Sequence, residues 1–458
     1  MSGVLRGAAD PARPGGPARL IVGNTNNEHL VSDLEAFPPG RRAVAGNLSA
    51  RLLWMLRPGD VLVLPQAQDE RFVRYVLGEL GVDRDSVTLL VPPPGVVGHD
   101  LLTGDRLSGE AFRRTVREAV AASGAELLIP YVFDPSIAAL ADHLGMEKAP
   151  EGAAFLEAGG ADLLNSKAVF RAVAAGIGVP LAEGVATRER ARAREFAGRL
   201  LARGDAVILK QDFHIGGFGN EILAPGPCVR QIGASALTVL ADDASVGRYF
   251  EDDWDRWTNG GRHPAVLEHY LPDSVAVGAE IAVTSGDVRV LNAGEMRMAP
   301  AFDGIVAPGT PGTEAARATF NEAALALSRA VRAIGYRGLI NIDGVVAPDG
   351  RTLLTEFNGR LGGSTHLHCL AEHLLGPDYA AHRVLITRNT WRVPSLDEAL
   401  RRTRSAGIAF DHADGTGVLL ICDHTRQFGT VEYCVAARDL ETALGIEKTL
   451  AALFADRS

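Results

Sequence analysis

The sequence has few cysteines and no basic excess, and each shortage excludes some classes of function. Cys228, Cys369, Cys422 and Cys434 form no CxxC pair and no zinc-binding spacing, which favours reduced, mostly buried thiols. The formal net charge of -10 argues against binding to the phosphate backbone of nucleic acids, because such proteins carry a basic excess. A small anionic ligand is not excluded, since its site depends on local charge.

Long hydrophobic runs are also missing. No segment reaches the roughly 18 consecutive apolar residues of a membrane-spanning helix, and the first residues lack the apolar core of a signal peptide. We therefore expect a cytoplasmic protein with no membrane partner. Residues 1–18 are rich in Gly, Pro, Ala and Arg, and we expect them to form a disordered tail.

The 458 residues, 47% of them hydrophobic, are enough for several domains. Residues 19–150 alternate between short apolar runs and helical patterns, which predicts an α/β domain with a parallel sheet. The expected strands are 20–22, 61–64, 87–91 and 127–129, and the expected helices include 70–80, 110–122 and one beginning at Asp134-Pro135. The polar turn at residues 23–27 is either a ligand site at the sheet edge or an ordinary turn.

The pattern changes over residues 151–390, where we expect an α+β domain of two subdomains. Its predicted elements are helices 166–176 and 313–334, strands 207–210, 266–268, 279–283 and 288–291, and a hairpin of strands 339–343 and 352–357 joined by Pro348-Asp349-Gly350. Residues 391–458 contain strand patterns at 417–423 and 429–436 and a helix pattern at 440–454. They predict a small C-terminal α+β module.

The hairpin carries the most informative side chains. Residues two apart on a strand share a face, so Glu356, Asn358 and Arg360 are expected to point the same way, with Asp343 opposite them. Carboxylate and amide oxygens suit magnesium, and a neighbouring arginine would stabilise a phosphoryl group. A surface hairpin with salt-bridged charges is the alternative.

Two weaker features precede the hairpin. Lys210 ends a strand and is followed by a loop containing Gly216, Gly217 and Gly219, which places a charge and backbone N–H groups where phosphates could bind. The loop is not a Walker motif, because no GK[ST] follows the glycines. The strand ending at Glu268, the segment His269 to Leu271, and Glu280 could hold a nucleoside, but an ordinary strand and loop explain them equally.

The order of these features over residues 160–375 resembles the ATP-grasp superfamily. The order is a helix lysine (Lys167), Lys210 with its glycine loop, the segment after Glu268, and the metal-type hairpin. The resemblance implies an ATP-grasp fold behind a pre-ATP-grasp α/β domain, with ATP and Mg²⁺ bound and Mn²⁺ as an alternative ion. It implies that Lys167 and Lys210 contact phosphates, Glu268, His269 and Leu271 surround adenine, and Glu280 holds the ribose. It assigns the metal to Asp343, Glu356 and Asn358, and the transferred phosphoryl group to Arg360.

The run from Asn358 to Thr365, the glycine loop and the C-terminal module further resemble the pheganomycin-type peptide ligases. That resemblance implies an acyl-phosphate intermediate, amide formation between a small carboxylate and an amine or peptide, and a place in antibiotic biosynthesis. Arg297, Ser364 and Thr365 are the candidate substrate residues, Arg297 also as a catalytic group, and His366 and His368 are candidate bases. Residues 303–312 are a candidate lid. A homodimer, other ATP-grasp chemistry (carboxylation or phosphotransfer) and a non-catalytic nucleotide-binding regulator stay open.

Overall fold

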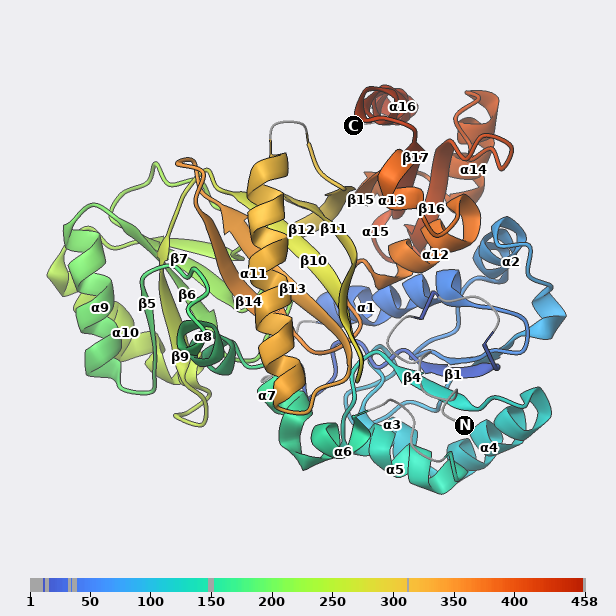
Figure 1. Cartoon of the computed structure of the whole chain (residues 1–458), viewed down its shortest axis with the longest axis horizontal. Coiled ribbons are helices and arrows are strands. Elements are labelled where there is room, and N and C mark those ends of the chain that lie inside the picture. The colour runs from blue at the N-terminus through green and yellow to red at the C-terminus, as the bar shows by residue number, and fades with distance from the viewer. Residues whose placement is uncertain are drawn as a thin grey trace.

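The computed structural model describes residues 11–12, 16–31, 34, 39–146, 152–310 and 313–455. Most of the tail predicted at residues 1–18 lies outside these ranges. Within them the strands form sheets of four, five and eight strands. Figure 1 shows the five-stranded sheet at the left, the four-stranded sheet at the lower right, and the eight-stranded sheet extending from the centre to the upper right. Among the described residues, no helix is both long and apolar enough to cross a lipid bilayer.

The N-terminal sheet has the order β3-β2-β1-β4, and all its strand pairs are parallel, which confirms the predicted α/β architecture. Its strands are β1 (Arg19–Val22), β2 (Val61–Val63), β3 (Thr88–Leu90) and β4 (Leu127–Pro130), and the helices around it are α1 (Pro39–Asn47), η1 (Leu48–Met55), α2 (Glu70–Glu79), η2 (Arg84–Ser86), α3 (Gly104–Ser108), α4 (Glu110–Ser123) and α5 (Pro135–Leu144). As predicted, the carboxylate of Asp134 caps α5 by accepting from Ser136 and Ile137.

The polar turn after β1 has a structural role. The Asn24 amide donates to Val132 O and to Asp134 Oδ2, and its Oδ1 accepts from the backbone N–H groups of Tyr131 and Val132. These buried bonds hold the segment after β4 in place, and that segment carries Tyr131 toward the site described below. The ordinary-turn alternative therefore describes residues 23–27 better than a ligand site does.

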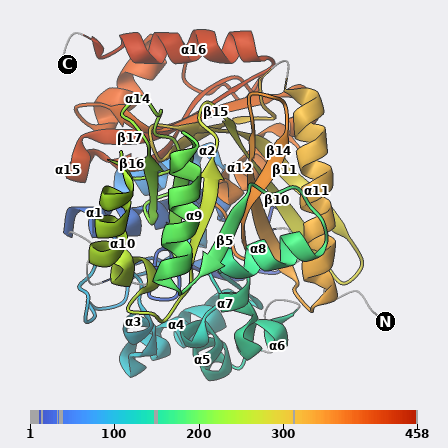
Figure 2. The ribbon, with the colours of Figure 1, turned by 90° about the vertical axis from the view of Figure 1, so that its left-hand side faces the viewer.

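The five-stranded sheet has the order β5-β9-β6-β7-β8. Its strands are β5 (Gly184–Thr187), β6 (Ala206–Gln211), β7 (Asn220–Ala224), β8 (Ala236–Val239) and β9 (Ala265–Tyr270). Helices α9 (Arg190–Ala202) and α10 (Asp243–Thr258) cover one face of it, as Figure 2 shows, and bury Phe196, Phe250 and Trp254 there. The connection from the N-terminal domain contains α6 (Ala153–Phe155), η3 (Leu156–Gly160), α7 (Ala161–Leu163) and α8 (Lys167–Gly176).

The eight-stranded sheet has the order β14-β13-β10-β11-β12-β15-β17-β16. Its strands are β10 (Val275–Val283), β11 (Val288–Met298), β12 (Phe302–Ala307), β13 (Gly338–Val346), β14 (Thr352–Asn358), β15 (Val384–Arg392), β16 (Gly417–His424) and β17 (Thr430–Ala437). The associated helices are α11 (Glu314–Ala333), α12 (Thr365–Leu375), α13 (Tyr379–His382), α14 (Leu396–Ser405), α15 (Thr425–Phe428) and α16 (Leu440–Ala452). Helix α11 lies across β10 and β13 in Figure 1 and buries Phe320 and Leu327.

Two features differ from the sequence expectations. The C-terminal strands β15, β17 and β16 extend the central sheet through the pairing of β12 with β15, so the small α+β module has no sheet of its own. The first half of the predicted lid at residues 303–312 is strand, because 303–307 belong to β12. Asp303 is held there by hydrogen bonds that it accepts from Arg388 and Thr390. Residues 311–312 lie outside the described ranges.

Candidate active site

The hairpin places its acidic residues face to face. In the pairing of β13 with β14, Asp343 lies opposite Glu356 and Asn341 opposite Asn358. Side chains of directly opposed residues lie on the same face of a sheet. A bulge after Asp343 shifts the register toward the turn, so the strands pair differently on its two sides. The arrangement expected from the sequence spacing is therefore present.

The two carboxyl groups have opposite electrostatic environments. Burial and the neighbouring Glu356 raise the pKa of Asp343 well above its usual range. Burial acts in the same direction on Glu356, but Lys167 and Lys210 outweigh it and hold the pKa of Glu356 below its usual range. The Lys167 Nζ lies 3.4 Å from Glu356 Oε2. A cation between the carboxylates would relieve the repulsion, so this donor set fits Mg²⁺.

Lys210 lies beside this hairpin although it belongs to the other sheet. Its Nζ is 2.6 Å from Glu268 Oε2 and 3.5 Å from the carbonyl oxygen of Thr355, and its side chain is only 5% exposed. Arg171 Nη1 contacts the other oxygen of Glu268 at 2.8 Å. The Glu268 side chain thus holds Lys210 at the junction of the two sheets, whereas His269, Tyr270 and Leu271 line the cavity beyond it.

Arg360 follows β14 and points back across the hairpin. Its Nη2 donates to Asn358 Oδ1 at 3.1 Å, its Nη1 donates to Leu361 O at 3.0 Å, and its guanidinium lies 5.5 Å from the centre of the Tyr131 ring. Its Nε is buried and has no hydrogen-bond partner among the described residues. A buried N–H group without an acceptor is costly, so an anionic ligand at this position fits the side chain.

The glycine loop between β6 and β7 has the backbone that its sequence suggests. Gly217 has a φ of +77°, and a Cβ there would lie 2.9 Å from Gly233 O. Gly216 and Gly217 line the cavity, whereas the space beside Gly219 is filled by His214. Lys167 Nζ donates to His214 O at 2.8 Å, which ties the start of the loop to α8.

The same loop lies against the N-terminal domain. The Arg41 guanidinium is 4.3 Å from the centre of the Phe218 ring. Ile215 packs against an apolar cluster of that domain, made of Leu30, Val31, Leu34, Ala45, Leu101 and Val132. The loop therefore covers the space between the five-stranded sheet and the N-terminal domain.

These parts enclose a cavity of about 320 Å³ at the meeting point of the three sheets. Its wall includes Leu271 and Ser274 from the segment after β9, Asp343 and Asn358 from the hairpin, and Arg51 from the N-terminal domain. This volume is within the range of small-molecule sites.

Three of the predicted positions need correction. Glu280 does not line the cavity: its carboxylate is 0% exposed and accepts from Asn292 and Thr365, which leaves no room for a ribose. Thr365 is occupied by the same bond and accepts from Gly362 N, so only Ser364 of that pair lines the cavity. Arg297 donates from Nη2 to Glu447 Oε2 at 2.8 Å, so it links β11 to α16 instead of facing a substrate.

The candidate bases lie outside the cavity wall as well. His366 is buried, and burial together with Arg51 lowers its pKa to about 3. The Nδ1 atom of His368 lies 3.1 Å from the hydroxyl of Tyr379, away from the hairpin. Neither ring has an accessible position for proton transfer in the cavity.

Sequence reasoning missed the residues that the N-terminal domain contributes. Tyr131 follows β4 at the carboxyl edge of a parallel sheet, where ligand contacts are common, and that rule could have found it. Arg51 lies in a 3-10 helix with no motif around it. A buried cluster of Cys422, His424 and Glu432 was missed too, because the three residues gather only when β16 and β17 pair.

Comparisons with known proteins agree with this architecture. The family model of the Pre ATP-grasp domain matches residues 49–146, and that of the PGM1 C-terminal domain matches residues 398–450. An L-propargylglycine–L-glutamate ligase of Streptantibioticus cattleyicolor is 25% identical over 374 residues, covering 76% of this chain and 74% of the relative.

Solved structures show the same fold. The ADP complex of an N5-carboxyaminoimidazole ribonucleotide synthetase superposes with a TM-score of 0.57 at 13% identity, covering 97% of this chain and 98% of that one. An L-amino acid ligase from Bacillus licheniformis superposes with a TM-score of 0.51 at 13% identity, covering 96% and 98%. The chain is therefore a protein of the ATP-grasp fold, with a Pre ATP-grasp domain before it and a PGM1 C-terminal domain after it.

Proposed function

We propose that this chain is an ATP-dependent carboxylate–amine ligase that activates a carboxylic acid as an acyl phosphate and joins it to an amine. The observation that carries the proposal is the meeting of Asp343, Glu356, Asn358, Arg360 and Lys210 around one cavity. Lys167, which the sequence placed at the phosphates, is not in the cavity wall and contacts Glu356 at 3.4 Å. The ligase names of the curated relative and of one solved neighbour support it.

ATP is proposed to bind with its base near Leu271 and Ser274 and its phosphates between Lys210 and the glycine loop. Leu271 and Ser274 line the cavity directly after β9 ends at Tyr270, where backbone groups become available. Asp343, Glu356 and Asn358 would hold Mg²⁺, which supplies charge neutralisation to the phosphates. Ser274 replaces Glu280 as the candidate for the ribose, because Ser274 lines the cavity and Glu280 does not.

The residues then have defined tasks in the reaction. Lys210 and Arg360 neutralise the γ-phosphoryl group while a carboxylate oxygen of the acid forms a bond to phosphorus and the bond to ADP breaks. The product is a mixed anhydride with a good leaving group. The amine attacks its carbonyl carbon, Arg360 stabilises the oxyanion through N–H groups such as the unoccupied Nε, and phosphate leaves.

Water must be kept out, because an acyl phosphate hydrolyses. The glycine loop provides the cover in this proposal: Phe218 lies against Arg41, and Ile215 packs on the N-terminal domain.

The test is a search for amide products. The protein is incubated with Mg-ATP and a matrix of amino acids and short peptides, and ADP, phosphate and new masses are measured. Arg360→Met should lower turnover by ~10²–10³-fold, the usual cost of losing one oxyanion donor, while Arg351→Met, a 64% exposed arginine of the same hairpin, should not.

Each outcome separates the alternatives. Amide formed in equal amount to ADP supports the ligase. ADP without any amide, under conditions in which an acid is phosphorylated or carboxylated, would identify another ATP-grasp chemistry. Binding of ATP with no turnover on any pair would indicate a nucleotide-binding regulator.

A further inference from the structure

The cavity wall contains a third cationic side chain, Arg51, which the proposed phosphate binding does not use. Lys210 and Arg360 line the cavity near the metal-type hairpin. Arg51 lines it too, but on η1 of the N-terminal domain, near Leu48 and Tyr131. Tyr131 contacts Arg360 through its ring and also lies within electrostatic reach of Arg51. Arg51 and Arg360 therefore both lie near Tyr131, in the part of the wall that the N-terminal domain contributes.

A chain of buried groups holds the Arg51 guanidinium in one orientation. Its Nε and Nη2 donate to the two carboxylate oxygens of Glu432 at 2.7 and 2.9 Å. Glu432 Oε1 also lies 3.0 Å from His424 Nε2, and His424 Nδ1 lies 2.9 Å from the amide nitrogen of Asn47. The side chain of Arg51 is 11% exposed and that of Glu432 is 3% exposed. Such a two-point pair fixes the plane of the guanidinium.

The remaining nitrogen, Nη1, is available to a ligand, and Arg51 lines the cavity. No described residue accepts a hydrogen bond from it, although Nε and Nη2 of the same group are both used. A contact that served only to join the two domains would not need an arginine in the cavity wall. A preorganised N–H donor on a positive group suits a carboxylate.

The same cluster has ligand types that can hold a metal ion, since the ligand atoms of Cys422, His424 and Glu432 lie within 4.8 Å of one another. Their polar atoms are already engaged: Glu432 by Arg51, His424 by Asn47, and Cys422 Sγ by the carbonyl oxygen of Asn47. The positive charge of Arg51 also opposes a second cation. The cluster therefore acts as the support of Arg51.

We propose that Arg51 binds a free carboxylate of the amine substrate, so that this substrate is an amino acid or an amine bearing a comparable acid group. The inference rests on the proposed ligase function. The carboxylate that is activated lies at Arg360 and the hairpin, so a second carboxylate is needed to explain Arg51. Phe302, which lines both the cavity and a small pocket beside Arg51, gives the substrate carbon chain an apolar surface.

The test compares amines that differ only in the acid group. Wild-type full-length protein, a donor acid and Mg-ATP are combined with an amino acid, its C-terminal amide and its decarboxylated amine. Hydroxylamine, which has no carboxylate, captures the acyl phosphate as a hydroxamate. We expect kcat/KM to be ~10–100-fold higher for the amino acid than for its amide, the usual worth of a hydrogen bond to a charged group.

The Arg51→Lys variant then tests whether Arg51 causes the preference for the amino acid over its amide. It keeps the charge beside Glu432 but loses the planar fork, so the ratio of amino-acid turnover to hydroxylamine turnover should fall ~10–100-fold. Arg71→Lys is the matched control, because Arg71 also pairs with an acid of the C-terminal module, Asp397, outside the cavity wall. Equal wild-type rates for the acid and its amide, or equal losses with both nucleophiles in Arg51→Lys, would overturn the proposal.

A binding measurement separates this inference from the ligase proposal. The melting temperature of the full chain with Mg-ADP is recorded with each amino acid and with its amide. A larger rise with the acid, absent in Arg51→Lys and kept in Arg71→Lys, supports the Arg51 site even if no amide is ever formed. The same rise with acid and amide would contradict it.

Discussion

Asp343 and Glu356 share a small volume, and their environments push their proton affinities apart. Asp343 is the group whose pKa rises through burial and the charge of Glu356, while Lys167 and Lys210 keep Glu356 ionised. A divalent cation needs both groups as carboxylates, so its binding must displace a proton from Asp343. The metal affinity of this site is therefore linked to pH.

We expect Mg²⁺ to bind more tightly as pH rises through the raised pKa of Asp343, by up to about tenfold per pH unit while that group is protonated. The sign follows because a group with a raised pKa holds its proton at pH values where a free carboxyl would have lost it. The measurement is the rise in melting temperature with Mg²⁺ or Mn²⁺ between pH 5 and pH 8.

Asp343→Asn removes both the titrating proton and the charge. The pH dependence of the metal-induced rise in melting temperature should therefore be lost in this variant. Asp349→Asn, on the exposed turn of the same hairpin, is the control and should leave it intact. A metal effect that is independent of pH in the wild-type protein would contradict this account of the pair.

The sequence could predict a site residue where local spacing alone determines its neighbours. Glu356 and Asn358 are two apart on β14, so strand periodicity predicts their common face, whereas Arg360 follows the strand and is held beside Asn358 by a hydrogen bond. Glu280 was predicted at a ribose from its order in the chain, yet its burial beneath Thr365 depends on packing that no spacing reveals. Arg51 becomes recognisable only through Glu432, which lies 381 residues away in the sequence.

Among the elements, the glycine loop between β6 and β7 has the clearest steric requirement. Gly217→Ala forces a Cβ to within 2.9 Å of Gly233 O at a φ of +77°, so the loop must shift away from the cavity. We expect the KM for ATP to rise and a larger share of ATP to be hydrolysed without amide formation. Simultaneous measurement of ADP and amide gives that share.

The control for the loop is Gly198→Ala in α9, where a Cβ meets nothing within 4 Å. Alanine there should stabilise the helix by up to ~1 kcal/mol without changing the ratio of ADP to amide. If Gly217→Ala leaves both KM and the ratio unchanged, the loop does not cover the reaction in the way proposed.

Element prediction succeeded where the periodicity was unambiguous. The four apolar runs of the N-terminal domain became four parallel strands, because buried parallel strands are continuous apolar segments. Strand β12 was interpreted as a loop because its Gly and Asp residues conceal the pattern, and its pairing with β11 and β15 supplies the missing stabilisation. The bulge after Asp343 also arises from pairing, which a single strand does not encode.

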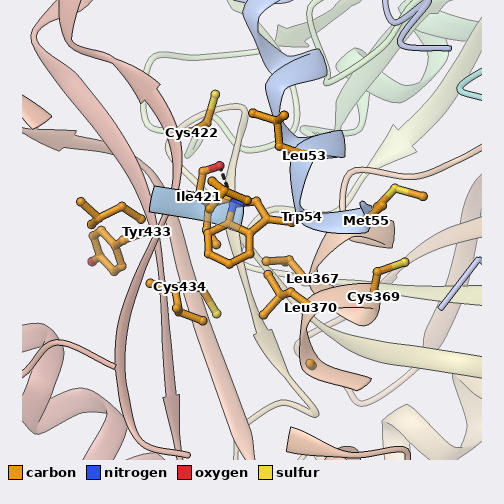
Figure 3. Close-up of a cluster of buried hydrophobic side chains, with 14 of the residues drawn as sticks. Leu53, Trp54, Met55, Leu367, Cys369, Leu370, Ile421, Cys422, Tyr433 and Cys434 are labelled. Carbon is orange, nitrogen blue, oxygen red and sulfur yellow. Dashed lines mark hydrogen bonds between the residues drawn. The ribbon is translucent and has the colours of Figure 1, made fainter. Parts of the chain in front are cut away.

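At the scale of the whole molecule, the N-terminal domain and the C-terminal strands share one apolar interface. Figure 3 shows Trp54 of η1 among Leu367, Leu370, Ile421 and other residues from the opposite side. Its Nε1 donates to Ile421 O at 3.0 Å, and the residue is only 1% exposed. This interface fixes the position of η1, and with it Arg51, relative to the central sheet.

Trp54→Ala should lower the free energy of unfolding by ~3–5 kcal/mol, because it opens a large cavity in that interface and leaves Ile421 O without its donor. Chemical denaturation followed by circular dichroism measures the change. Leu444→Ala, at a 45% exposed position on α16, should cost less than ~0.5 kcal/mol. A loss for Trp54→Ala as small as that of the control would show that the interface contributes little to stability.

The continuity of the central sheet into the C-terminal strands could not be predicted, because β12 and β15 are separated by the hairpin and the three helices α11, α12 and α13 in the sequence. Local patterns identified β16, β17 and α16, but long-range pairing decided where they lie. The proposed chemistry depends on this assembly, since the five-stranded sheet, the eight-stranded sheet and the N-terminal domain all contribute to the cavity wall.

The central claim is that a carboxylate oxygen attacks the γ-phosphorus of ATP before the amine reacts. The most direct measurement follows ¹⁸O from a donor acid labelled in both carboxylate oxygens, with mass analysis of the products. We predict that the phosphate released with each amide carries one ¹⁸O, that the amide keeps the other, and that the nucleotide product is unlabelled ADP. Unlabelled phosphate, or labelled AMP with pyrophosphate, would contradict the account.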